Sequence, residues 1–400
     1  MMPAALLESA RALTETLRTD RRYLHAHAET GFDLPATFDY VWRTLTEIGL
    51  TPRKCGRCGV VADLGQGEDC TLLRADMDAL PIREASGEDF ACTEGRMHAC
   101  GHDLHTAMLL GAARLLKARE KELRGTVRLM FQPAEEILAG SADMLANGLL
   151  DATQPRRAFM LHVLTGIDVP AGTVIVSAPG VSAPAADMFE IRVQGKGCHG
   201  AMPHTGIDPI VAGAQIVLAL ENLIAREISL QQRAALTIGS FRAGEGPNVI
   251  PDSAVLQGSL RAFEDDTAAY LLHRVPEIAS LTAQAYRAQA EFVHLSHCPT
   301  LRNDEAVCTL AMNALTALLD PEQVLRSDAL QGGASRFSGS EDFAEVSHAV
   351  PAVMAALAAG EPADGYTHPA HHPSVRFDER VLPIGAAVYA AVGMGGGMMK

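Results

Sequence analysis

The sequence has no uninterrupted apolar run close to the roughly 18 to 20 residues with which a helix spans a bilayer. Its first residues, MMPAALLESARALTETLRTDRRYLHAH, lack a basic stretch followed by an unbroken apolar core, so they do not resemble a signal peptide. Apolar residues recur there instead at the spacing of an amphipathic surface helix. They are Leu6, Leu7, Ala10, Leu13 and Leu17. We therefore expect a cytoplasmic protein without a membrane partner.

Cysteine is scarce, with eight residues in 400, which is too few for a disulfide scaffold. Cys55 and Cys58 form a Cys-x-x-Cys pair, but no second pair and no nearby histidine complete a zinc knuckle. We expect these two thiols to be structural, because free cysteine is commonly a small buried residue.

Positive charge is also short, because 33 Lys and Arg residues face 48 Asp and Glu residues and leave a net charge of −15. Neither nucleic acid nor an anionic membrane is attracted by such a field, so neither is expected as a partner. A small anionic substrate stays compatible with this charge, since it responds to local Arg, Lys and backbone N–H groups.

The length of 400 residues exceeds what one hydrophobic core usually serves, so two domains are expected. In the first half, strand patterns alternate with a helix pattern over residues 104–116. The expected strands are 59–65, 71–82, 126–133 and 158–164. This alternation predicts an α/β fold with a mostly parallel mixed sheet flanked by helices.

An inserted domain is predicted after residues 177–188, where Pro, Ala and Ser concentrate as in a linker. The expected elements that follow are strand 189–197, helix 208–226, strands 234–244 and 253–263, and helix 267–290. They are typical of a small α+β domain of the ferredoxin-like type. We therefore predict a discontinuous catalytic domain, residues 1–184 and 296–400, interrupted by a smaller domain, residues 185–295. The sequence shows no internal repeat.

Side chains that can bind a metal follow the expected strands at the edge where an open α/β sheet binds ligands. They are Asp76, Asp78, Cys100, His102, Glu135, Glu136, His162, His368, His371 and His372. One thiol, several imidazoles and paired carboxylates suit zinc and also allow manganese, cobalt or nickel. Each has an ordinary structural explanation alone, since a histidine at a strand end is more often a hydrogen-bonded core residue. Their convergence at one edge is what predicts a metal site.

The pair Glu135–Glu136 has a further property if it is extended, because adjacent side chains then point in opposite directions. One carboxylate can bind metal while its neighbour faces the attacking water, as metal-assisted hydrolysis requires. Cys100 precedes a helix start, where the dipole favours a thiolate, and a bound metal would deprotonate it.

A series of short segments runs in a fixed order from Arg74 to Glu379: RADMDALPI, MHACGHDLHTAMLLGAA, FQPAEE, LHV, GKGCHGAMPH, NVIPD, GSLRAF, GSEDFA and HHPSVRFDE. In this order they resemble the amidohydrolase branch of the aminoacylase-like two-metal peptidases. That branch contains hippurate hydrolases, N-acyl-amino-acid amidohydrolases and plant indole-acetyl-amino-acid hydrolases. RYLHAHAETGF resembles the family's R-x-x-H-x-x-P-E opening, with Ala28 where proline is common, so the resemblance covers nearly the whole chain.

The resemblance implies a metal-dependent amidohydrolase that cleaves the amide of an N-acyl amino acid and uses two divalent ions, Zn, Mn, Co or Ni. The implied ligands are Cys100, His102, Glu136, His162 and His371. The family commonly reads His-x-Pro in the last segment, which favours His371 over His372. Glu135 is the implied general base, and Asp78 is implied to orient a histidine ligand.

In the inserted domain, the resemblance implies that His199 stabilises the developing oxyanion and that Asn248 and Arg261 bind the carboxylate of the substrate. A pairing of Arg261 with Glu264 is an equally good expectation, and His204 has a family counterpart without an assigned role. Cys198 replaces a glycine that is usual before the histidine, and we hypothesise that it makes activity sensitive to oxidants.

Ile137 and Leu138 replace a glycine-rich run, so we expect a reshaped pocket wall. The exposed sheet edge of the inserted domain predicts a homodimer, and domain closure is expected to bring the oxyanion histidine to the metals. Two alternatives stay open. One is a metallo-dipeptidase or N-acetyl-diaminopimelate deacetylase, and the other is a binding protein with a disabled site.

Overall fold

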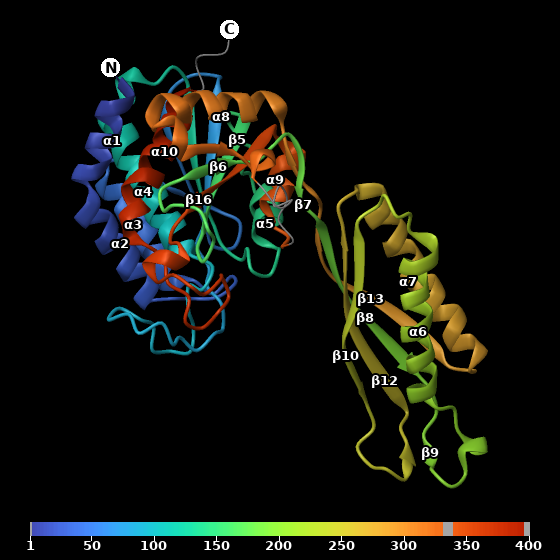
Figure 1. Ribbon diagram of the computed structural model, residues 1–400. Coiled ribbons are helices and arrows are strands. Elements are labelled where there is room, and N and C mark those ends of the chain that lie inside the picture. Colours follow the sequence, from blue (N-terminus) through green and yellow to red (C-terminus); the bar gives the residue numbers. More distant parts are fainter. Residues whose placement is uncertain (1, 331–338, 396–400) are drawn as a thin grey trace. The chain divides into compact units, whose positions relative to one another are not determined.

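The computed structural model describes residues 2–330 and 339–395 and divides the chain into two compact units (Figure 1). The larger unit contains the chain up to Ser182, the segment that begins at Arg302 and the segment that begins at Glu341. The smaller unit is formed chiefly by Ala183–Leu301. Most of the smaller unit is therefore a single insertion between Ser182 and Arg302 of the larger unit.

An eight-stranded sheet forms the centre of the larger unit, in the order β1-β2-β4-β3-β5-β16-β6-β15. Its strands are β1 (Arg53–Cys55), β2 (Gly59–Gly65), β3 (Cys70–Asp76), β4 (Thr126–Gln132), β5 (Pro155–Leu164), β6 (Val174–Val176), β15 (Val324–Arg326) and β16 (Ala352–Ala358). The pairs β4–β3, β3–β5, β5–β16 and β6–β15 are parallel and the other three are antiparallel. This confirms the predicted mixed, mostly parallel sheet.

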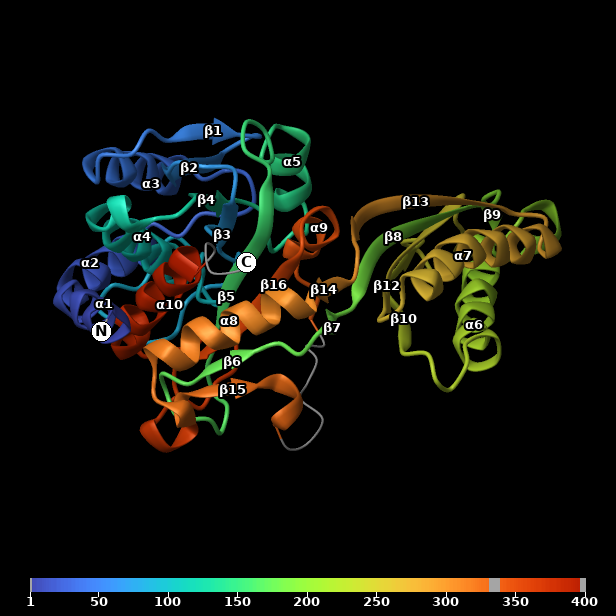
Figure 2. The same ribbon diagram turned by 90° about the horizontal axis from the view of Figure 1, so that it is seen from above.

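Helices cover both faces of this sheet, and every residue of β3, β4 and β16 is therefore buried. The helices α1 to α4 and α10 lie on one side of β5 and β16, and α5 and α9 lie on the other (Figures 1 and 2). The helices of the larger unit, with α8 among them, are α1 (Met2–Ala12), α2 (Thr14–Ala26), α3 (Pro35–Glu47), α4 (His102–Ala118), α5 (Gly140–Ala146), α8 (Glu305–Leu318), α9 (Phe343–Ala349) and α10 (Leu382–Gly395). The amphipathic segment predicted at the start is two helices, with Leu6 and Leu17 turned into the core.

The parallel strands β3, β4 and β5 end at the same edge of the sheet, and this edge carries the predicted metal-binding residues. The strand expected over residues 71–82 is shorter than predicted, because β3 ends at Asp76. The N–H of Met77 still donates to the carbonyl of Gln132 in β4. Beyond that bond the carboxylate of Asp78 binds backbone N–H groups of a loop, so the chain leaves the sheet there.

The smaller unit has an antiparallel sheet in the order β10-β12-β8-β13, with α6 and α7 packed on one face (Figure 2). Its elements follow in the order β8 (Ala185–Gln194), α6 (Pro209–Glu227), β10 (Ala234–Ala243), β12 (Ser253–Ala262), α7 (Asp265–Ala285) and β13 (Gln289–Cys298). This β-α-β-β-α-β order confirms the predicted ferredoxin-like arrangement. The remaining short strands are β7 (Gly180–Ala183), β9 (Cys198–His199), β11 (Val249–Ile250) and β14 (Leu301–Asn303).

Helix α6 approaches the length of a membrane span, although polar residues interrupt its apolar sequence. Its 19 residues are long and apolar enough to cross a bilayer by length and composition alone. In the structure its buried residues, among them Ile216 and Leu220, pack against the sheet of the smaller unit as in the core helix of a globular protein. The charged residues that interrupt it in the sequence lie on its other face.

Candidate metal centre

The loop that carries Cys100 and His102 depends on the glycine between them. Gly101 precedes the first residue of α4 and has a φ of +88°, in the left-handed region that favours glycine. A Cβ on this residue would lie 2.4 Å from Cγ2 of Val163 and 3.1 Å from the ring of Phe377. The glycine therefore lets the thiol and the imidazole approach the end of β5.

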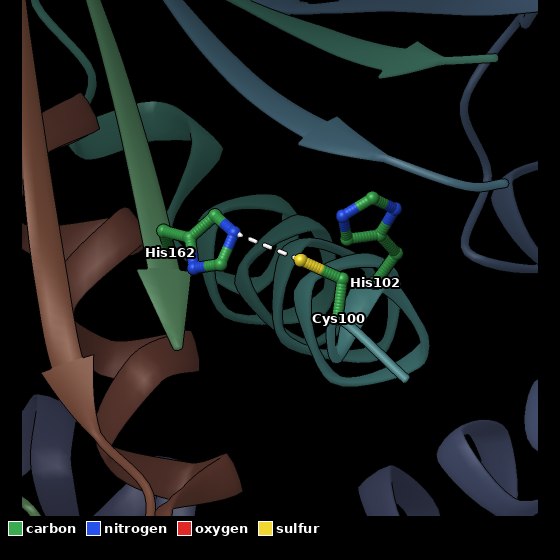
Figure 3. A group of neighbouring side chains, drawn as sticks. All are labelled: Cys100, His102 and His162. Atoms are coloured by element: carbon green, nitrogen blue, oxygen red, sulfur yellow. Dashed lines mark hydrogen bonds between the residues drawn. The ribbon is translucent and has the colours of Figure 1, made fainter. Parts of the chain in front are cut away.

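Cys100, His102 and His162 form a group whose donor atoms all lie within 4.8 Å of one another (Figure 3). His102 begins α4, His162 comes from β5, and the Cys100 Sγ lies 3.5 Å from the His162 Nε2. The Nδ1 of His102 is 2.8 Å from the Asp78 carbonyl, and that of His162 is 2.7 Å from the Val163 carbonyl. Because a carbonyl only accepts, each Nδ1 carries the proton and each Nε2 presents a lone pair.

Glu135 and Glu136 lie in a tight loop after β4 that the chain supports in several ways. The carboxylate of Asp78 accepts the N–H of Glu135 at 2.9 Å and that of Glu136 at 3.2 Å. Ala134 and Leu138, on either side, have positive φ values of 56° and 54°, which cost non-glycine residues free energy. Asp78 thus contacts His102 through its backbone carbonyl, while its carboxylate positions the two glutamates, and its predicted orienting role stays a prediction.

The Oε1 atom of Glu136 connects this loop with the C-terminal histidines. It lies 3.5 Å from the Nε2 of His371, and these two residues form another group of possible ligands with Cys100. His371 has a left-handed φ of 67°. His372 turns elsewhere, because its ring stacks on His368 at 4.1 Å. The geometry therefore favours His371 as the ligand.

Two buried atoms at this centre have no hydrogen-bond partner among the described residues, the Nε2 of His102 and the Oε1 of Glu136. Such atoms are costly unless something compensates them. They lie 3.9 Å apart, and both belong to groups that can hold a metal ion. Around these two unpaired atoms lie a thiol, imidazole lone pairs and carboxylates. This set of donors fits divalent cations such as zinc.

The pKa shifts of the residues at this centre also favour a bound cation. Burial raises the pKa of Glu136 to about 8, and the charges of Asp76 and Glu341 add to this effect. Burial also raises the pKa of the Cys100 thiol well above its usual range and lowers that of His162 to about 3. The cluster alone thus favours uncharged side chains. A divalent cation would stabilise the carboxylate and thiolate forms and restore the balance of charge.

Arg74 contacts three buried acids, of which Asp76 was a candidate metal ligand in the sequence, whereas Glu341 and Asp342 had no assigned function. Its Nη1 lies 2.7 Å from Asp76, its Nη2 lies 2.7 Å from Glu341 and 3.1 Å from Asp342, and its Nε donates to Gln132 at 2.8 Å. The segments RADMDALPI and GSEDFA signalled these residues, but nothing in them reveals that the two segments meet. The fold thus places the Arg74 guanidinium among buried acids behind the metal-binding edge.

His105 is structural in its contacts. Its Nδ1 donates to Asp76 at 2.6 Å, and its Nε2 accepts the N–H of Val163 at 2.8 Å. Asp76, His102 and His105 also form a possible ligand group. Because both ring nitrogens of His105 are already engaged, the group around Cys100 is better suited to a cation.

The predicted substrate-binding residues belong to the smaller unit. His199 lies in β9, where its exposed ring accepts the N–H of Ala201 at 3.0 Å. Asn248 precedes the paired strand β11. Arg261, in β12, donates to the Ser340 hydroxyl at 2.8 Å. The positions of these residues do not show whether they stabilise an oxyanion or bind substrate, so both roles stay predictions.

The two predicted structural cysteines are in keeping with that expectation. The Sγ of Cys55 contacts the carbonyl of Met144 at 3.3 Å, and that of Cys58 contacts the carbonyl of Phe32 at 3.3 Å. Burial raises the pKa of the Cys58 thiol to about 11.

Comparisons with known proteins agree with this geometry. N-acetylcysteine deacetylase from Bacillus subtilis is 36% identical over 375 residues, which cover 92% of this chain and 94% of that protein. An IAA-amino acid hydrolase of Arabidopsis thaliana, ILR1-like 2, is 36% identical over 380 residues, which cover 93% of this chain and 83% of that protein. A solved structure of a dinuclear metal binding peptidase from Bacillus subtilis has a TM-score of 0.77 at 33% identity, covering 96% of this chain and 98% of that one.

The profile of Peptidase family M20/M25/M40 matches residues 72–394, most of the chain. This span contains the thiol, the histidines and the paired glutamates of the centre. It confirms the resemblance found in the order of the sequence segments. The chain therefore belongs to the peptidase family M20/M25/M40.

Proposed function

We propose that this protein is a metal-dependent amidohydrolase that cleaves N-acyl amino acids into a carboxylic acid and a free amino acid. The observation that carries the proposal is the convergence of lone pairs from Cys100, His102, His162 and Glu136 beside the second carboxylate, Glu135. The relatives, which are a deacetylase of N-acetylcysteine and a hydrolase of IAA-amino acids, support the class of reaction.

The proposed ligands of two divalent ions, Zn, Mn, Co or Ni, are Cys100, His102, Glu136, His162 and His371. The solved relative described as dinuclear supports the number of ions. When bound, such ions polarise the amide carbonyl and acidify water. The chain's own contribution is to fix the histidine tautomers through the carbonyls of Asp78 and Val163 and to keep Glu136 in place through its backbone.

Glu135 is the proposed general base. Its Oε2 lies 4.0 Å from the Nε2 of His102, and its backbone is held by Asp78. Burial and the charges of Glu341 and Asp342 hold the pKa of Glu135 well above its usual range. A carboxylate in this environment readily takes the proton of the attacking water and then gives it to the leaving amine.

The residues 185–295 are proposed as a lid and dimerisation domain, and residues 1–184 and 296–400 as the catalytic domain, in a cytoplasmic homodimer. In this proposal His199 stabilises the oxyanion, and Asn248 and Arg261 bind the carboxylate of the substrate. Ile137, which follows the two glutamates with 52% of its surface exposed, is proposed to contact an apolar acyl group of the substrate.

The test is hydrolysis of N-acetylcysteine, IAA-amino acids, hippurate-like conjugates, N-acetyl-diaminopimelate and dipeptides by protein of measured metal content. Glu135→Gln is expected to lose turnover by about 10² to 10⁴-fold with unchanged metal content. Glu122→Gln, on an exposed carboxylate of the same unit, is the matched control and keeps full activity.

Each outcome of this test decides between the alternatives. Preference for dipeptides or N-acetyl-diaminopimelate would replace the proposed substrate class. Equal turnover by wild type and Glu135→Gln would refute the general base. No turnover on any substrate by metal-loaded wild type would favour a binding protein with a disabled site.

A further inference from the structure

We propose a second, separate metal site in the smaller unit, formed by Asp187 of β8 with His294 and His297 of β13, for a divalent transition metal such as zinc. None of the proposed ligands of the two catalytic metal ions belongs to this unit. The two strands are hydrogen-bonded neighbours and lie side by side in both views (Figures 1 and 2).

An irregularity in the pairing of β13 creates this site. Side chains three residues apart on a regular strand point to opposite faces of the sheet. In β13, however, His294 is opposite Phe189 and Ser296 is opposite Met188, so one extra residue lies between them. The extra residue of this bulge turns the following side chains to the other face of the sheet. His297 is consequently opposite Asp187 and lies on the same face as His294.

The three side chains converge on one point. The Oδ1 of Asp187 lies 2.8 Å from the Nε2 of His294 and 2.7 Å from the Nδ1 of His297. All three donor atoms lie within 4.8 Å of one another. Ligand bonds to zinc of about 2.0 to 2.2 Å therefore need only small rotations of the rings.

The burial of the three residues suits a site that is fixed on one side and open on the other. The Asp187 side chain is only 1% exposed, whereas the imidazoles of His294 and His297 are 40% and 47% exposed. The carboxylate is thus held inside the sheet, and both rings lie partly at the surface. Because both imidazoles are partly exposed, we expect a three-ligand site completed by solvent.

The donor types determine which ion fits. Two imidazoles and one carboxylate suit zinc, cobalt, nickel or copper, whereas calcium and magnesium prefer sets of oxygen atoms. In the metal-free form each ring nitrogen that faces Asp187 can donate its proton to the carboxylate. When the ion binds, each neutral imidazole carries its single proton on the other ring nitrogen, so no proton has to leave the histidine.

The test counts metal ions on the full chain. Chelator-treated protein is titrated with Zn²⁺ against a chromogenic chelator and then dialysed, and bound zinc per chain is measured. Wild type is expected to bind one equivalent more than His297→Gln and one more than Asp187→Asn. The result rests on this difference, so it does not depend on the proposed function or on the number of ions at the other centre.

His273→Gln is the matched control, because His273 is an exposed histidine of α7 in the same unit. This variant is expected to bind as much zinc as wild type. Since Asp187 is buried, circular dichroism checks that its variant is folded, and His294→Gln serves as a second, half-exposed substitution. With Co²⁺, the equivalent lost in the variants is expected to lack the thiolate-to-cobalt charge-transfer band, because its ligands are only nitrogen and oxygen.

Two results would overturn the proposal. One is equal zinc content in wild type and in both histidine variants. The other is loss of an equivalent on histidine substitution while folded Asp187→Asn binds like wild type, which would reduce the site to adventitious binding by two surface imidazoles.

Discussion

Gly101→Ala gives the sharpest test of how the fold delivers the metal-binding loop. The added methyl group would lie 2.4 Å from Cγ2 of Val163, and the residue would have to keep a φ of +88°. Either the start of α4 or the end of β5 must shift. Because Cys100 and His102 flank the substituted residue, we expect lower metal content as well as lower stability.

The expected loss of stability has two parts. A left-handed conformation costs a non-glycine residue about 1 to 2 kcal/mol. Overpacking of a filled site adds about 1 to 3 kcal/mol, and Val163 has little freedom to yield because it is buried and its N–H is bound to His105. Gly87→Ala separates the two parts, since Gly87 has a φ of +79° but a Cβ there meets nothing within 4 Å.

The assay is urea unfolding followed by tryptophan fluorescence. The only tryptophan of the chain, Trp42, lies in α3 and therefore reports on the larger unit. Gly101→Ala is expected to lose about 1 to 3 kcal/mol more free energy of unfolding than Gly87→Ala. Equal losses in the two variants, with unchanged zinc content in Gly101→Ala, would refute the steric argument.

Three further predictions follow from buried groups and from the metal centre. Burial opposes protonation of His25, but the charge and hydrogen bond of Asp103 outweigh it and raise its pKa to about 9. The stabilisation that results is complete below about pH 6.5, and about 3 kcal/mol of it is lost as the pH rises to about 9. The free energy of unfolding of His25→Gln should therefore depend less on pH over this window than that of the wild type. Tyr389→Phe should cost about 1 to 3 kcal/mol in urea unfolding, because its buried hydroxyl donates to the Arg74 carbonyl and accepts the Leu161 N–H. Chelation should abolish hydrolysis and lower the melting temperature, and readdition of Zn, Mn, Co or Ni that fails to restore either would contradict a metal enzyme.

The local sequence pattern was sufficient to predict the limits of a strand that is buried along most of its length. The apolar run GVVADLG predicted a strand over residues 59–65, and β2 has these limits. The same reasoning extended β3 too far, because the apolar alternation continues past Asp76 although the backbone leaves the sheet. What ended the strand is a contact between Asp78 and the loop after β4, which no local pattern contains.

In the candidate site, too, some features could be predicted from the sequence and others depend on contacts made by the fold. Residue types and order pointed to the thiol, the histidines and the glutamates, since these are chemical properties of the sequence itself. The cluster of Arg74 with Glu341 could not be derived, because the two residues are 267 positions apart. The difference between His371 and His372 likewise depends on a single left-handed residue in a loop.

The position of β16 in the large sheet has a consequence for synthesis on the ribosome. This strand lies between β5 and β6, with Ala352 opposite Ala158, although the two residues are 194 positions apart in the sequence. Closing so long a loop is slow, and the centre of the sheet stays open until the chain has been translated past residue 358. The smaller unit needs only residues 185–298 for its sheet and can fold first. We therefore expect nascent chains to hold a finished inserted unit beside an incomplete sheet whose exposed strand edges need protection from aggregation.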